Sequence, residues 1–111
     1  MRILLVDDIP QILRSYCRLI ARRHEVRTAT GVNDALAILA SDFVPDIVLC
    51  DYHLGDGLGL QVLAEVKARH PRAQRYLATG FAGELPAQAH AIASVLEKGS
   101  QRLLNLFRTL G

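Results

Sequence analysis

The chain begins with MRILLVDD (residues 1–8), in which an apolar run stops at two adjacent acids, Asp7 and Asp8. A short, almost continuously apolar run is typical of a strand that is covered on both faces of a sheet. Two carboxylates side by side at the end of such a strand are costly, because like charges repel each other and the loss of hydration penalises both. The stretch therefore predicts a central strand, and its two acids raise the question of what offsets their charge.

Four further short runs alternate with segments of helical period along the rest of the chain. The runs are EVRTA (25–29), DIVLC (46–50), RYLAT (75–79) and SVLEK (94–98). Between them, apolar residues recur every three or four positions in residues 9–20, 35–39, 60–66 and 103–110, and more weakly in residues 87–93. The alternation predicts an α/β fold with a doubly wound, five-stranded parallel sheet and five helices on its two faces.

Polar side chains close four of the five predicted strands. Asp7 and Asp8 follow the first strand, and Asp51 follows the third. Thr79 ends the fourth strand and Lys98 ends the fifth. Because ligands of open parallel sheets bind beyond the carboxyl ends of the strands, we expect these residues to converge on one site.

The residue types at this predicted site suit magnesium and a phosphoryl group. Three carboxylates supply the oxygen ligands that Mg²⁺ prefers, and Mg²⁺ bridges readily to phosphate. One carboxylate can attack phosphorus, while Lys98 and the Thr79 hydroxyl can cover the remaining phosphoryl oxygens. Lys98 is one of only two lysines in the chain and offers a compact positive charge for this task.

Length and composition limit the alternatives. The 111 residues suffice for one domain, which we assign to residues 1–111. A net charge of +2 makes no case for nucleic acid binding. Cys17 and Cys50 both lie in apolar patterns, which favours buried, reduced thiols. No apolar run approaches the ~18 residues of a membrane span, so we expect a soluble, cytoplasmic protein.

Five motifs carry a resemblance to a known family. They are LLVDD (4–8), DIVLCD (46–51), YHLGDGLGL (52–60), LATG (77–80) and LEKG (96–99). With these motifs in this order, the chain resembles the response regulator receiver domain of two-component signal transduction over essentially its whole length. The resemblance implies the sheet order 2-1-3-4-5, which a chemotaxis receiver also has.

The resemblance also implies roles for individual residues. Asp51 would be the phosphoacceptor, supplied by a histidine kinase or a histidine phosphotransfer protein. Asp8, Asp51 and the backbone carbonyl of His53 would ligate Mg²⁺ directly, and Asp7 would act through a water molecule. Thr79 and Lys98 would contact the phosphoryl oxygens. The protein would be a signalling phosphoacceptor that assists its own phosphorylation and dephosphorylation, and not an enzyme with a separate substrate.

The chain departs from the family around its fourth helix and fifth strand. Val95 stands where receivers often carry an aromatic switch residue, and Gly99 stands where the lysine is usually followed by proline. We expect the Lys98–Gly99 peptide to be trans or its loop to be rebuilt, because a non-proline cis bond costs ~3 kcal/mol. Residues 82–93 are short for the family, which predicts a short, displaced or partly unfolded fourth helix. Together these departures predict an atypical switch region, with output through an unknown partner protein.

Other readings stay open. The chain could be a pseudo-receiver, an interaction module that phosphorylation does not switch. An aspartyl-phosphate hydrolase is disfavoured because its usual acid-x-acid motif and cap are missing.

Three smaller predictions concern individual segments. Asp56 and Gly57 predict the turn that caps the third helix. His53 is more typical of a solvated loop histidine than of a residue that tunes phosphoryl lifetime, and the fifth helix is a candidate homodimer face.

Overall fold

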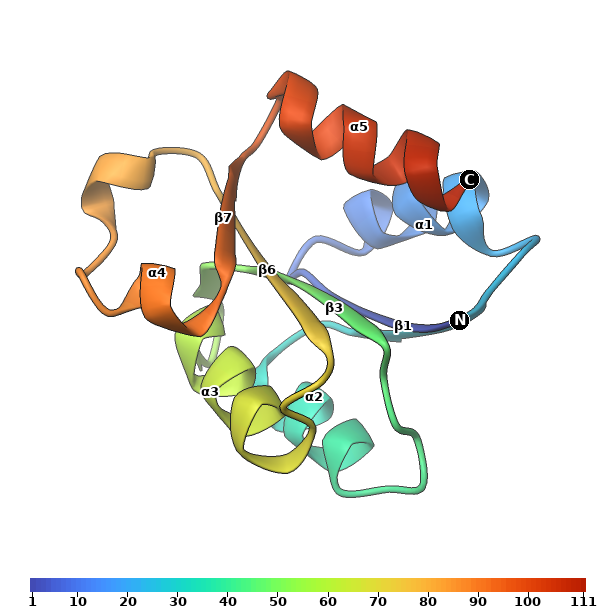
Figure 1. Cartoon of the computed structure of the whole chain (residues 1–111), viewed down its shortest axis with the longest axis horizontal. Helices are drawn as coiled ribbons and strands as arrows, with labels where there is room; N and C mark the ends of the chain where they lie inside the picture. The colour runs from blue at the N-terminus through green and yellow to red at the C-terminus, as the bar shows by residue number, and fades with distance from the viewer.

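A computed structural model describes all 111 residues, and its centre is a five-stranded parallel sheet. The strands are β1 (Arg2–Val6), β2 (Glu25–Ala29), β3 (Ile47–Asp51), β6 (Gln74–Thr79) and β7 (Ser94–Glu97). Their order is β2-β1-β3-β6-β7, and every neighbouring pair is parallel (Figure 1). This is the expected order 2-1-3-4-5, because β6 and β7 are the fourth and fifth strands of the sheet along the chain.

Helices cover both faces of the sheet (Figure 1). Those on one face are α1 (Pro10–Ile20) and α5 (Gln101–Leu110); those on the other are α2 (Val32–Leu39), α3 (Gly59–Arg69) and α4 (Ala89–Ile92). Local signals set several of their ends. Pro10 occupies the first turn of α1, where its missing N–H costs nothing. The Ser100 side chain caps α5 by accepting from the Leu103 amide at 3.3 Å.

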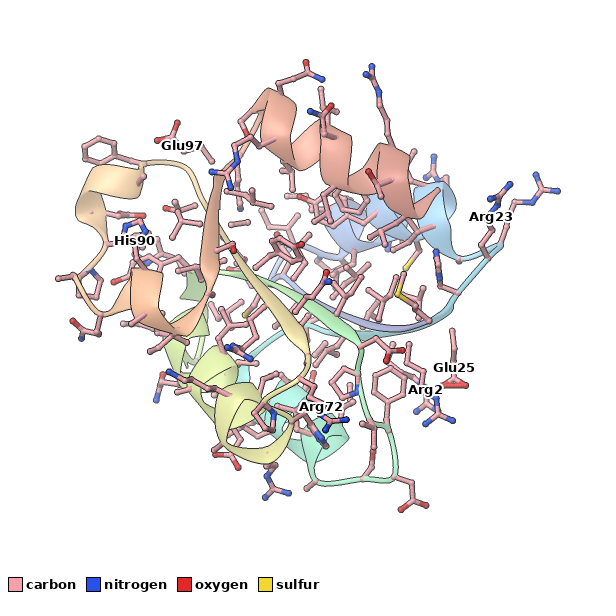
Figure 2. All side chains as sticks on the ribbon, viewed as in Figure 1. Arg2, Arg23, Glu25, Arg72, His90 and Glu97 are labelled. Atoms are coloured by element: carbon pink, nitrogen blue, oxygen red, sulfur yellow. The ribbon has the colours of Figure 1, made fainter.

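Charged side chains extend outward from this framework, as the labelled residues in Figure 2 show. Arg2 and Glu25 lie at the amino ends of β1 and β2, where Arg2 Nε and Glu25 Oε2 are 3.4 Å apart. This exposed pair is at the end of the sheet opposite the polar residues that close the strands. No helix of the chain combines the length and the apolar character that crossing a membrane requires.

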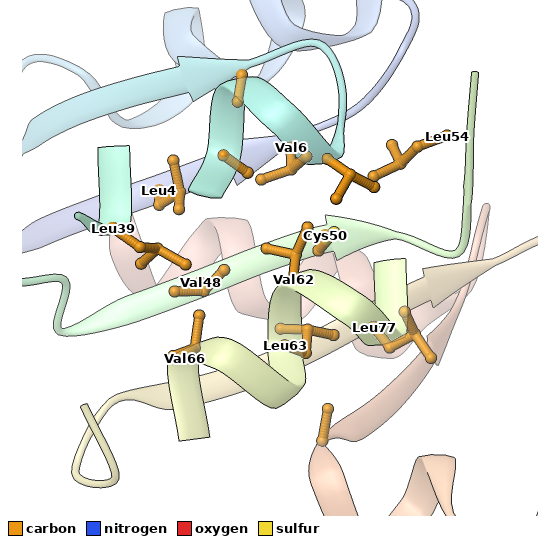
Figure 3. Close-up of a cluster of buried hydrophobic side chains, with 14 of the residues drawn as sticks. Leu4, Val6, Leu39, Val48, Cys50, Leu54, Val62, Leu63, Val66 and Leu77 are labelled. Carbon is orange, nitrogen blue, oxygen red and sulfur yellow. The ribbon is translucent and has the colours of Figure 1, made fainter. Parts of the chain in front are cut away.

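The core consists of two apolar clusters, one on each face of the sheet. The larger, with 18 buried residues, packs the sheet against α2, α3 and α4 (Figure 3). The smaller, with 11, packs the other face against α1 and α5. Along β1, Leu4 and Val6 belong to the larger cluster whereas Ile3 and Leu5 belong to the smaller. This alternation confirms that the apolar opening run is a strand covered on both faces.

The connection between β6 and β7 is irregular. It contains only η1 (Ala82–Glu84), a single 3-10 turn, and the four-residue α4. Pro86 lies between them and cannot donate the backbone hydrogen bond that would join the two into one helix. The expectation of a short fourth helix is therefore confirmed.

The segment that joins β3 to α3 forms a small antiparallel pair, β4 (His53–Leu54) with β5 (Gly57–Leu58). The prediction that Asp56 caps the third helix is wrong. Its carboxylate instead accepts from the Val32 amide at 2.7 Å and the Asn33 amide at 3.0 Å, at the start of α2. The first free amide of α3, at Leu58, is satisfied by the Gln61 side chain at 2.8 Å.

Candidate functional site

The predicted site residues lie together at the carboxyl ends of the strands. The strand ladder continues into the site, because the Asp7 amide donates to Ala29 O at 3.1 Å and the Lys98 amide donates to Thr79 O at 2.8 Å. Backbone pairing therefore sets where these side chains begin. The convergence expected from the parallel sheet is what the structure shows.

Asp7, Asp8 and Asp51 form a compact acidic cluster. One carboxylate oxygen from each lies within 4.8 Å of the others. Asp7 and Asp51 are buried, whereas Asp8 is exposed. Oxygen ligands around an octahedral Mg²⁺ ion lie about 3 to 4 Å apart, since each is about 2.1 Å from the ion. The cluster thus brings three carboxylate oxygens close to the spacing that a small divalent cation requires.

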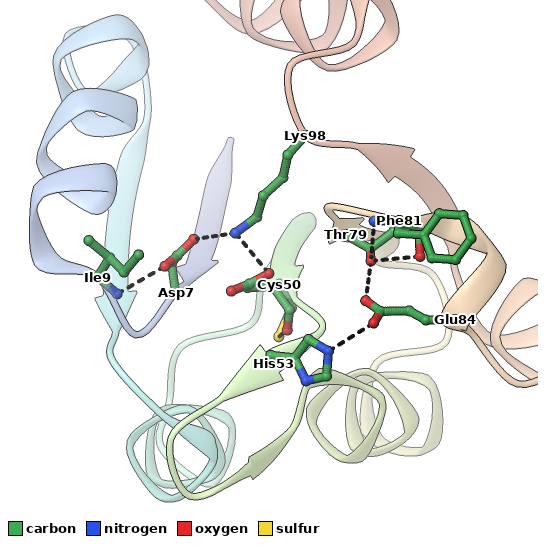
Figure 4. Close-up of polar contacts among 9 residues, drawn as sticks. Asp7, Ile9, Cys50, His53, Thr79, Phe81, Glu84 and Lys98 are labelled. Atoms are coloured by element: carbon green, nitrogen blue, oxygen red, sulfur yellow. Dashed lines mark hydrogen bonds and ion pairs between the residues drawn. The ribbon is translucent and has the colours of Figure 1, made fainter.

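The pKa of Asp7 reflects the unfavourable burial of negative charge in this cluster. Burial raises the pKa of its carboxyl above the ordinary value, and the charge of Asp51 raises the pKa further. The Ile9 amide, which donates to Asp7 Oδ1 at 2.9 Å, and the Lys98 ammonium oppose that increase (Figure 4). A divalent cation would relieve this unfavourable burial of negative charge.

Lys98 supplies the positive charge inside the site. Its Nζ lies 3.0 Å from Asp51 Oδ1 and 3.7 Å from Asp7 Oδ2. Burial alone would lower the pKa of this lysine, but its hydrogen bond to Asp51 and the two negative charges outweigh burial and raise it. The ammonium is therefore held in its charged form against the Asp51 carboxylate.

The backbone around Asp51 is fixed by close packing with the start of α3. A Cβ atom at Gly59 would lie 2.0 Å from the Asp51 carbonyl oxygen, so only glycine allows this approach. The Gly59 amide donates to Tyr52 O at 2.7 Å, and the Tyr52 amide donates to Ala78 O at 2.9 Å. The backbone that directly follows Asp51 is thus anchored both to the end of β6 and to the start of α3. Behind it, burial raises the pKa of the Cys50 thiol well above its ordinary value, which keeps that thiol protonated.

Thr79 is buried, but its hydroxyl already has a partner. Oγ1 donates to Glu84 Oε1 at 2.8 Å, and it accepts from the Phe81 amide at 3.3 Å. The other oxygen of that carboxylate, Glu84 Oε2, accepts from His53 Nε2 at 3.1 Å. We call this carboxylate with its two hydrogen bonds the Glu84 bridge (Figure 4).

The Glu84 bridge is a part of the site that the sequence did not reveal. His53, expected to be a solvated loop residue, is largely exposed but has Glu84 as a partner. The hydrogen bonds from His53 and Thr79 lower the pKa of the Glu84 carboxyl. The carboxylate is therefore ionised at neutral pH and acts only as a hydrogen-bond acceptor.

The loop after Lys98 is rebuilt in comparison with the pattern that the resemblance implied. The structure has no cis peptide bond, and Gly99 adopts φ of 78°. That left-handed conformation excludes proline, whose ring fixes φ near −65°. Val95, at the position of the usual aromatic, is half-buried on β7.

Comparisons with known proteins agree with this geometry. The sequence matches the response regulator receiver domain over residues 3–101. No curated protein sequence matches it. A CheY-like receiver domain protein of Methanospirillum hungatei is similar in structure, with a TM-score of 0.81 and 25% identity, covering 97% of this chain and 90% of that one.

Two further solved structures are similar. The Thermotoga maritima response regulator TrrA, in complex with Mg²⁺-BeF, has a TM-score of 0.76 and 24% identity, covering 99% of this chain and 98% of that one. A Burkholderia pseudomallei response regulator with a phosphorylated aspartic acid, a calcium ion and citrate has a TM-score of 0.79 and 27% identity, covering 95% and 64%. Since the family match spans most of the sequence, the chain belongs to the response regulator receiver domain family of two-component systems.

Proposed function

We propose that the chain accepts a phosphoryl group on Asp51 in a reaction that depends on Mg²⁺. The observation that carries the proposal is the position of the Asp51 carboxylate, which lies within the acidic cluster and 3.0 Å from the Lys98 ammonium. Family membership supports the same role, because receiver domains are signalling phosphoacceptors and not enzymes with a separate substrate. The phosphorylated aspartic acid of the Burkholderia relative gives it a precedent.

Asp8, Asp51 and the His53 carbonyl would hold the metal ion directly, and Asp7 would do so through a water molecule. The ion would neutralise negative charge on the phosphoryl oxygens. An oxygen of Asp51 forms a bond to phosphorus while the phosphorus–nitrogen bond of a phosphohistidine donor breaks. The electron pair stays with the imidazole nitrogen, which takes up a proton. Lys98 and the Thr79 hydroxyl then donate to the phosphoryl oxygens.

The donor in this proposal is a histidine kinase or a histidine phosphotransfer protein, and output passes to a protein partner. The whole of residues 1–111 acts as one receiver domain. Two free thiols, at Cys17 and Cys50, fit the reducing cytoplasm. On α5, Leu104 is an exposed apolar residue, and a homodimer through that helix stays a prediction.

Two observations favour a second candidate, a pseudo-receiver that binds partners without being switched by phosphorylation. The Thr79 hydroxyl is occupied by Glu84, and Val95 replaces the aromatic residue of the usual switch. In such a module the acidic cluster would bind a cation but no phosphoryl group would be gained.

Intact-mass spectrometry separates the two candidates. The protein and its Asp51→Asn variant are incubated with a small phosphodonor, each with and without Mg²⁺. We expect one added phosphoryl group on the wild-type protein only, and only with the metal. An unmodified wild-type protein, together with no binding of the phosphoryl mimic beryllofluoride, would establish the pseudo-receiver instead.

A further inference from the structure

The Glu84 bridge places a carboxylate charge against Thr79, the residue whose hydroxyl should donate to a phosphoryl oxygen. Thr79 is 1% exposed, so water has almost no access to it. Its hydroxyl carries one proton, and the nearest acceptor of that proton is Glu84 Oε1 at 2.8 Å; the Phe81 carbonyl is farther, at 3.3 Å. A hydroxyl has only one hydrogen to donate. Thr79 therefore cannot keep its bond to Glu84 and also donate to a phosphoryl oxygen.

Charge makes this competition stronger. A carboxylate and an acyl phosphate are both anions, and two like charges that compete for one donor repel each other. Glu84 has no lysine or arginine partner; its ion pair is with His53, on the segment that follows Asp51. The bridge therefore joins the segments after β3 and after β6 across the site.

The segment that carries Glu84 is weakly held. The hydrogen bonds of η1, from the Glu84 amide to Phe81 O and from the Leu85 amide to Ala82 O, are both 3.2 Å long. The Ala82 amide has only the Glu97 side chain, at 3.4 Å. These lengths lie at or beyond the upper end of the usual range of about 2.7–3.2 Å. By contrast, Arg75 Nε donates to Ile92 O at 2.7 Å and fixes the end of α4.

We propose that Glu84 is a positioning residue that competes with the phosphoryl group for the Thr79 hydroxyl. The proposal rests on the phosphoacceptor function above. In the free protein the Glu84 bridge holds the hydroxyl and keeps η1 in place. When a phosphoryl group takes that hydrogen bond, Glu84 is released, and residues 81–88 move while the far end of α4 stays anchored. The site thereby reports its state without an aromatic residue at position 95.

The test compares the affinity of variants for beryllofluoride in saturating Mg²⁺. Glu84→Ala removes the competing acceptor and its charge, so we expect it to bind the mimic about three- to tenfold more tightly, the net effect of one ordinary hydrogen bond. Glu84→Gln keeps a neutral acceptor and should lie between Glu84→Ala and the wild type. Glu25→Ala removes the same charge at the opposite end of the sheet and should match the wild type.

Repeating the comparison in a Thr79→Val variant separates the effect of hydrogen bonding on the affinity for the mimic from the effect of charge. In Thr79→Val the hydroxyl is absent, so the gain from Glu84→Ala should shrink to less than about twofold if competition for the hydroxyl causes it. A gain of the same size in both backgrounds would overturn the proposal, because repulsion alone would then explain it. An unchanged or weaker affinity in Glu84→Ala would overturn it as well.

Methyl NMR of the ligand-free proteins provides a readout that needs no phosphoryl chemistry. The Thr79 methyl resonance of Glu84→Ala should lie displaced from its wild-type position, toward that of the wild type with the mimic bound. An unmoved resonance in a folded variant would contradict the bridge itself. Failure of the wild-type protein to bind Mg²⁺ and beryllofluoride at all would instead reject the phosphoacceptor function, so the two failures are distinguishable.

Discussion

The two sides of the site are built in different ways. On the acid side, Asp7, Asp51 and Lys98 extend from paired strands and are linked by ion contacts of 3.0 and 3.7 Å. On the threonine side, Thr79 ends a strand, but its partner Glu84 comes from a single 3-10 turn. The sheet therefore fixes the groups that we propose for phosphoryl chemistry, whereas the proposed reporter, the Thr79 hydroxyl, is held by one carboxylate on an irregular segment.

The largest effect that this contrast predicts is on the stability of the two regions. Leu77 on β6 is fully buried in the larger core cluster, and Leu85, next to η1, packs against that cluster only in part. Leu77→Ala should lower the free energy of unfolding by about 2–5 kcal/mol, whereas Leu85→Ala should lower it by less than about 1.5 kcal/mol. Urea denaturation measures both. Equal losses would show that the connection after β6 is as tightly packed as the strand itself.

The next effect concerns the metal. Asp8 is exposed and no hydrogen bond to its side chain is present, so its carboxylate is free to bind a cation. Asp8→Ala should weaken Mg²⁺ binding by about tenfold or more, since even indirect partners of a metal ligand contribute that much. Calorimetric titration measures the change, with the exposed Asp42→Ala as the control of equal charge. Unaltered affinity in Asp8→Ala would remove Asp8 from the metal site.

The smallest effect is on stability at the acid side. Because the pKa of Asp7 is raised in the folded protein, the folded state binds more protons than the unfolded state between the ordinary and the raised pKa. Stability due to this group therefore falls as pH rises through that window and stays lower above it. Asp7→Asn should remove this loss and raise the free energy of unfolding at neutral pH by up to about 1 kcal/mol. Lower stability of Asp7→Asn without metal would mean that Lys98 more than compensates for the burial of Asp7.

The fold and most of the site could be predicted because both follow from strand periodicity. Parallel strands bring their carboxyl ends to one edge, so Asp7, Asp51, Thr79 and Lys98 had to meet once the strands were identified. The predicted run at residues 25–29 coincides with β2, and the ends of the other strands lie within one residue of their predicted positions. Buried strands and the residues that close them thus carry a strong signal.

The errors share a physical cause. The sequence pattern predicts that Asp56 caps the nearest helix, yet Asp56 caps α2, whose start lies 24 residues earlier in the chain. Packing of α2 beside α3 brings the two together, and no local pattern encodes that contact. Glu84 was missed because a three-residue turn has no periodicity, and its partners Thr79 and His53 come from different strand ends. Side chains on irregular segments need the tertiary structure before their partners can be named.

One NMR titration tests the contrast between the two sides most directly. Mg²⁺ is added first and beryllofluoride second, while backbone amides and the Thr79 methyl are followed. We predict that Mg²⁺ alone shifts the resonances of residues 7–9 and 51–53, and that those of residues 79–85 move only when beryllofluoride takes the Thr79 hydroxyl. A threonine side that responds fully to Mg²⁺ alone, or that stays unmoved when the mimic is bound, would contradict the separate roles of the two sides.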